Sequence, residues 1–145
     1  MNKFLSGKPV VVPTDFSDAS LKAIGRALDL VSDRTLVKVL HVSPIPAGGE
    51  FGSVWASITS DDILRGANEQ FAKAVEKHPA LKGVEFKAMI GDPGLVVADY
   101  AKEIGAELIV IPSHGRTGIS RLLLGSVAER VIRYASCPVL VLRGS

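Results

Sequence analysis

The sequence predicts one α/β domain in which a mostly parallel sheet of five strands carries helices on both faces. Short apolar runs alternate along the chain with longer segments whose apolar residues recur at helical spacing. The chain has 145 residues, of which 47% are hydrophobic and 22% are charged, as is ordinary for a globular domain. Because no repeat, low-complexity tract or linker divides the chain, we predict one domain over residues 1–145. We predict the strand order 3-2-1-4-5 for its sheet.

Most of the expected strands are continuous apolar runs, which is typical of strands buried on both faces of a parallel sheet. They are expected at Pro9–Pro13, Leu36–Val42, Val84–Ile90, Leu108–Pro112 and Pro138–Leu142. The third strand differs, because its residues alternate between apolar and polar. We expect the last strand at an edge of the sheet, where its apolar side chains need a cover.

The expected helices begin at residues that suit a helix N-terminus. Asp92 followed by Pro93 is the strongest of these signals, because Asp caps a helix and Pro is favoured at its first position. The helices are expected after Ser17, over about Thr59–His78, from Pro93 towards Gly105, and over Ser126–Tyr134.

Charge and composition argue against several classes of protein. The net charge of +2 is too small to indicate nucleic-acid binding, and no apolar run reaches the roughly 20 residues of a membrane helix. The lone cysteine, Cys137, excludes an internal disulfide, and the N-terminus shows no signal peptide, so we expect a cytoplasmic protein. Residues 112–145 contain five arginines and one glutamate, which either favour anions or form a solvated helix face.

Two segments are expected to meet where ligands bind in folds of this kind. In open α/β sheets the ligand crevice lies outside the carboxyl ends of the strands, at the point where the strand order reverses. Pro13, Thr14 and Asp15 follow the first expected strand, and Ser113 and His114 follow the fourth. The crevice is therefore predicted between these two segments.

The segment after the fourth strand is rich in glycine. Gly115 and Gly118 permit tight turns, and Gly125 with Ser126 begins a helix whose free amides and positive dipole end attract anions. From spacing alone, the segment is either a phosphate cradle or an ordinary loop followed by a Ser-capped helix.

This segment resembles the nucleotide loop of universal stress proteins, whose pattern is Gly, two residues, Gly, nine residues, Gly, then Ser or Thr. Gly115, Gly125 and Ser126 take the last three places, whereas Pro112 stands where the first glycine is expected. The resemblance extends from about Pro9 to Arg143. It includes Pro13–Ser17, Leu40–Val42, Gly91–Pro93 and Cys137–Leu142, each of which is similar to a segment of that family.

The resemblance implies an adenine nucleotide, ATP or else ADP or AMP, together with Mg²⁺. It places Asp15 and the backbone of Val42 at the adenosine, and the glycine-rich segment at the phosphates. The full set of implied binding residues is Pro13, Thr14, Asp15, Val42, Ser113, His114, Gly115, Arg116, Gly118, Gly125, Ser126 and Val127. It also implies a homodimer in which the last strand, with Val139, Leu140, Val141 and Leu142, pairs with its copy.

Pro112 leaves the function open between alternatives. Proline has no N–H to offer a phosphate, so we expect weakened but retained binding, with Arg116 compensating through a charge-assisted contact. The alternatives are a family member that binds no nucleotide and acts through protein partners, and a slow ATPase.

No catalytic residue or metal ligand is assigned, since neither a Walker A loop, a Rossmann fingerprint nor a nucleophile–base pair is found. His41 is expected to be a hydrogen-bonded structural residue, and Cys137 a small core residue.

Overall fold

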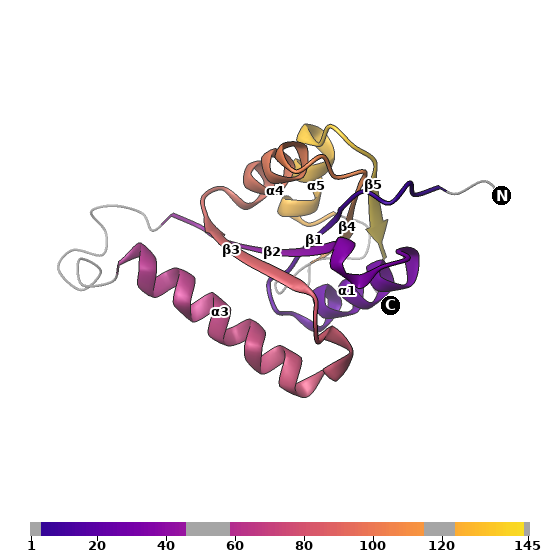
Figure 1. Ribbon diagram of the computed structural model, residues 1–145. Coiled ribbons are helices and arrows are strands. Elements are labelled where there is room, and N and C mark those ends of the chain that lie inside the picture. Colours follow the sequence, from indigo (N-terminus) through magenta and orange to yellow (C-terminus); the bar gives the residue numbers. More distant parts are fainter. Residues whose placement is uncertain (1–3, 46–58, 115–123, 144–145) are drawn as a thin grey trace.

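A parallel sheet of five strands, in the order β3-β2-β1-β4-β5, lies at the centre of the described residues (Figure 1). The computed structural model describes residues 4–45, 59–114 and 124–143. The strands are β1 (Val10–Pro13), β2 (Val37–Ser43), β3 (Glu85–Ile90), β4 (Leu108–Pro112) and β5 (Val139–Leu142). All neighbouring pairs run parallel, so the predicted sheet and its strand order are confirmed.

Helices cover both faces of this sheet, as predicted. Those described are α1 (Asp18–Leu30), α3 (Ser60–Lys77), α4 (Pro93–Glu103) and α5 (Ser126–Tyr134), with short 3₁₀ turns at Arg34–Leu36 and Pro79–Leu81. In Figure 1, α4 and α5 lie together on one face, and α1 and α3 lie on the other. The two faces bury separate apolar clusters, one around Ile24 and Phe71 and the other around Leu40 and Ile109.

Element boundaries differ from expectation by one or two residues, for identifiable reasons. Pro9 and Pro138 lie just outside β1 and β5, although both carbonyls accept hydrogen bonds from β4 or its preceding residue. Thr59 is the N-cap of α3 rather than part of it: its side chain accepts from the Asp62 amide, and the Asp62 side chain accepts from the Thr59 amide. The Arg34–Leu36 turn delays the start of β2 to Val37.

Glu107 ties the N-terminal segment to the start of β4. Its carboxylate accepts hydrogen bonds from the Ser6 amide at 2.8 and 3.0 Å, from the Ser6 hydroxyl at 3.0 Å and from the Lys8 amide at 2.7 Å. These bonds, with the Ser6 amide first, hold the pKa of the Glu107 carboxyl below its usual value of 4.5.

We expect Glu107→Gln to destabilise the protein slightly at pH 7 and to lose its effect in acid. A carboxyl whose pKa is lowered on folding adds stability above its unfolded pKa, and this is lost as the pH falls through its folded pKa. Urea unfolding of both proteins at pH 7 and at about pH 3 measures the difference. Glu76→Gln, on the exposed surface of α3, is the control, and an equal difference at both pH values would contradict the prediction.

Candidate functional site

The predicted crevice corresponds to the point where the strand order reverses, between β1 and β4. β1 continues along the chain to β2 on one side, while β4 pairs with β1 on the other. Thr14 and Ser113 follow these two strands directly, and both are buried polar residues, with 5% and 7% exposure. The two segments expected to meet therefore leave adjacent strands at the same edge of the sheet, where α/β folds bind ligands.

A tightly bonded turn carries Asp15 at this edge. The Thr14 amide donates to the Leu40 carbonyl at 2.8 Å, and the Thr14 hydroxyl accepts from the Phe16 amide at 3.0 Å. One oxygen of Asp15 accepts from the Ser17 amide at 3.0 Å. Ser17 then caps α1 by accepting from the Ser20 amide. The turn thus fixes the backbone on both sides of Asp15.

Phe16 holds a backbone conformation that large side chains rarely adopt, with a φ of 66°. Its ring lies 4.7 Å from the His41 ring and 6.2 Å from the Phe86 ring, and it packs against the core on the α1 side. Such strain persists only where surrounding contacts over-determine it, and it is common at functional sites. The aromatic contacts therefore keep the Asp15 turn in place.

His41 supports the same turn from β2. Its Nδ1 lies 2.7 Å from the Thr14 carbonyl oxygen, so the prediction of a hydrogen-bonded structural histidine is confirmed. Val42 follows His41 in β2, is 8% exposed and pairs with Met89 of β3. A contact between its backbone and adenosine stays a prediction.

The start of α5 is held beside the end of β4. The Ser113 amide donates to the Leu142 carbonyl at 2.8 Å, and the Gly125 amide donates to the Ser113 carbonyl at 2.7 Å. Gly125 is the N-cap of α5 and has no side chain to cap the amides of Ser126 and Val127. The first amides of a helix have no acceptor within the helix, and its N-terminus carries partial positive charge. This end of α5 can therefore bind an anion.

His114 supplies a second polar group here. Its Nδ1 lies 3.2 Å from the Ser113 hydroxyl, and its Nε2 is buried without a hydrogen-bond partner in the described structure. One nitrogen of this half-buried ring therefore requires a polar partner, and a phosphate oxygen would be such a partner. Gly115, Arg116 and Gly118, which were predicted with it, lie outside the described residues.

Two observations were not foreseen from the sequence. Ser20 of α1 hydrogen-bonds to the Thr14 hydroxyl at 2.8 Å, and both residues are buried. The arginines of residues 112–145 are partly neutralised, since Arg130 pairs with Asp92 and Arg133 pairs with Glu129. The contacts of Ser20 with Thr14 and of Arg130 with Asp92 join different elements, which no local motif reveals, whereas the spacing of Glu129 and Arg133 is that of neighbours on one helix.

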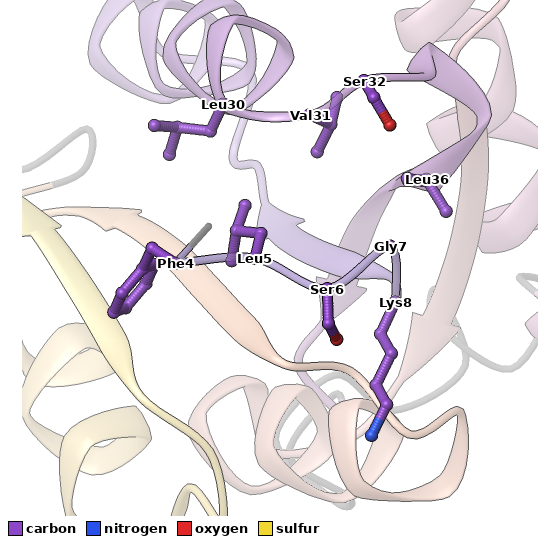
Figure 2. Close-up of a pocket in the computed structure, with 9 residues that line it drawn as sticks. All are labelled: Phe4, Leu5, Ser6, Gly7, Lys8, Leu30, Val31, Ser32 and Leu36. Carbon is purple, nitrogen blue, oxygen red and sulfur yellow. The ribbon is translucent and has the colours of Figure 1, made fainter. Parts of the chain in front are cut away.

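Other parts of the described structure carry no comparable chemistry. A hollow of about 590 Å³ lies at the opposite end of the sheet, before β1 and β2 (Figure 2). It is lined mainly by apolar groups, from Phe4, Leu5, Ser6, Gly7, Lys8, Leu30, Val31, Ser32 and Leu36.

Within the described ranges, no group of three or more His, Cys, Asp or Glu residues could hold a metal ion, and no helix is long and apolar enough to cross a membrane. Burial raises the pKa of the Cys137 thiol, which makes it a poor nucleophile.

Comparison with known proteins gives a consistent result. The model of the universal stress protein family matches residues 7–143. A universal stress protein of Methanocaldococcus jannaschii is 37% identical over 145 residues, covering 94% of this chain and 82% of that protein.

Solved structures similar to this chain include two with bound nucleotides. A universal stress protein in complex with cAMP is 30% identical, with a TM-score of 0.56, covering 95% of this chain and 98% of that one. The universal stress protein of Archaeoglobus fulgidus in complex with dAMP is 27% identical, with a TM-score of 0.56, covering 92% and 96%.

Proposed function

Because the chain belongs to the universal stress protein family, we propose that it binds an adenine nucleotide, ATP foremost, between the carboxyl ends of β1 and β4. The main support for this proposal is the hydrogen bond from the Gly125 amide to the Ser113 carbonyl, which holds the N-terminus of α5 beside the end of β4. The Asp15 turn leaves the neighbouring strand at the same edge. The cAMP and dAMP complexes of the two relatives support an adenine nucleotide as the ligand.

The two sides of the crevice suit the two ends of such a ligand. Asp15 would accept hydrogen bonds from the adenosine, beside the backbone of Pro13 and Thr14 in its own segment and of Val42 in β2. The amides at Gly125–Val127 and the Ser126 hydroxyl would donate to phosphate oxygens, which favours the charge of the ligand at a helix N-terminus. Ser113 and His114 would add side-chain contacts, and Gly115, Arg116 and Gly118 would complete the cradle.

Mg²⁺ would enter with the triphosphate. This ion keeps several waters and commonly binds through substrate phosphates and one or two protein oxygens. We therefore expect it on the phosphate oxygens rather than in a cage of carboxylates. Its contribution would be to neutralise the phosphate charge.

Pro112 is expected to weaken the binding without abolishing it. It is the last residue of β4 and pairs with Leu142, so it comes just before the Ser113 and His114 side of the crevice. Proline cannot donate a backbone hydrogen bond. The Ser126 hydroxyl and the α5 amides remain as donors.

Titration calorimetry with ATP and Mg²⁺ tests the proposal on the wild type, Pro112→Gly and Ser126→Ala. We expect wild-type binding, tighter binding by Pro112→Gly, and roughly 10- to 150-fold weaker binding by Ser126→Ala, since a hydrogen bond to a charged group contributes about 1.5–3 kcal/mol. Ser32→Ala, in the hollow at the opposite end of the sheet, is the matched control and should bind like the wild type. Binding by Pro112→Gly alone would show a disabled natural site and favour a member that acts through protein partners.

We also propose that the chain forms a homodimer through β5. This strand ends the sheet order, and Leu140 on it is 38% exposed. An apolar edge strand with an exposed side chain is a surface that pairing with a second copy would cover. Leu140→Lys should shift the protein from dimer to monomer in sedimentation, and a wild type that sediments as a monomer would contradict the proposal.

A further inference from the structure

We propose that Arg130 and Asp92 are positioning residues, which hold the first turn of α5 where its amides meet the phosphates. Neither residue is assigned a contact with the ligand. The inference rests on the proposed nucleotide function and adds a link from α4 to the phosphate side of that site.

A single carboxylate joins the two helices. One Asp92 oxygen accepts from the Gly94 amide at 3.2 Å and so caps the N-terminus of α4. The other oxygen accepts from the Arg130 guanidinium at 2.7 Å. Arg130 lies in the second turn of α5, so the start of α4 is tied to the part of α5 next to the proposed phosphate amides.

The backbones come into close contact at the same place. A Cβ atom at Gly94 would lie 2.4 Å from the Arg130 Cβ, a distance that real Cβ atoms do not show. The Arg130 guanidinium also lies 5.9 Å from the centroid of the Tyr134 ring. α5 therefore rests directly on the first turn of α4, and its position depends on the absence of a side chain at Gly94.

The other anchors of α5 join it to the sheet and to the end of β4, rather than to α4. Ala128 and Val131 are buried, with 3% and 0% exposure, and hold the helix against the sheet. The hydrogen bond from Gly125 to Ser113 holds its start. Movement across α4 is opposed by the link between Asp92 and Arg130.

Geometry, rather than stability, is where the ion pair should matter. Both side chains are 42% exposed, and ion pairs this exposed contribute little to folding. Hydrogen bonds, by contrast, weaken steeply as donors move out of line with their acceptors. A small displacement of the α5 amides would therefore cost phosphate affinity while the fold is retained.

Calorimetry with ATP and with adenosine distinguishes positioning from a general structural role. Asp92→Asn keeps a good helix cap but removes the charge, and Arg130→Met keeps the alkyl chain but removes the guanidinium. We expect each variant to bind ATP about three- to tenfold more weakly and adenosine unchanged, with no further loss in the double variant. Arg130→Lys should recover part of the ATP affinity. Gly94→Ala should reproduce the loss by displacing α5.

Arg133→Met is the matched control, because Arg133 pairs with Glu129 within α5 and should leave both affinities unchanged. Wild-type ATP affinity in Asp92→Asn and Arg130→Met would overturn the inference alone. Equal losses for ATP and adenosine would overturn it in favour of a general structural role. A wild type that binds neither ligand would overturn the proposed function, and this inference with it.

Discussion

Replacing Leu40 by alanine should lower the free energy of unfolding by about 2–5 kcal/mol, the range measured for buried leucines in protein cores. Leu40 is fully buried in β2, between the paired residues Pro13 of β1 and Lys87 of β3. The substitution removes apolar contacts of the cluster on the α4 and α5 side and leaves a cavity. Because the Leu40 carbonyl also accepts from the Thr14 amide, relaxation around the cavity should loosen the Asp15 turn.

Leu30→Ala provides the matched control for this prediction, since the same atoms are removed from a side chain that is 46% exposed in the last turn of α1. Urea unfolding at one fixed protein concentration measures both variants, because dimerisation would make stability depend on concentration. Equal losses for Leu40→Ala and Leu30→Ala would contradict the burial argument.

Gly91→Ala should destabilise the protein by about 1–3 kcal/mol through backbone strain alone. Gly91 joins β3 to α4 with a φ of 154°, and its amide donates to the Ser43 carbonyl at 2.9 Å. An added Cβ would lie 2.6 Å from a methyl carbon of Val96, so steric repulsion adds to the strain. Gly91 also precedes Asp92, and the change should therefore disturb the α4 cap as well.

Gly66→Ala is the same substitution in the opposite environment. Gly66 lies inside α3, and a Cβ there would meet nothing within 4 Å. Alanine is preferred to glycine within helices, so this variant should be stabilised by about 0.5–1 kcal/mol. Shifts of the same sign for Gly91→Ala and Gly66→Ala in urea unfolding would refute the conformational argument.

The sheet could be predicted because its signals are local and repeated. Val10, Val11 and Val12 are all fully buried, and successive side chains point to opposite faces of a sheet. Only a strand covered on both faces requires such a continuous apolar run. Similarly, Asp92 and Pro93 predicted the start of α4 because a cap and a favoured first residue act within one turn.

The candidate site could be predicted only in outline. The rule that ligands lie at the carboxyl ends of parallel strands placed Asp15 and Ser113 just after two of the strands, and the structure shows that these strands are adjacent. The left-handed backbone of Phe16 was not predictable, since aromatic residues disfavour it and the contacts with His41 and Phe86 that hold it come from other strands.

The sequence by itself determined the alternation of strands and helices and the family to which the chain belongs, because periodicity, caps and motifs are written in consecutive residues. Only the tertiary structure decided that Gly125 bonds to Ser113, that Ser20 bonds to Thr14 and that Arg130 pairs with Asp92. The side chains of Arg130 and Asp92 are 38 positions apart. A contact over such a separation depends on how two helices pack, and no local preference specifies it.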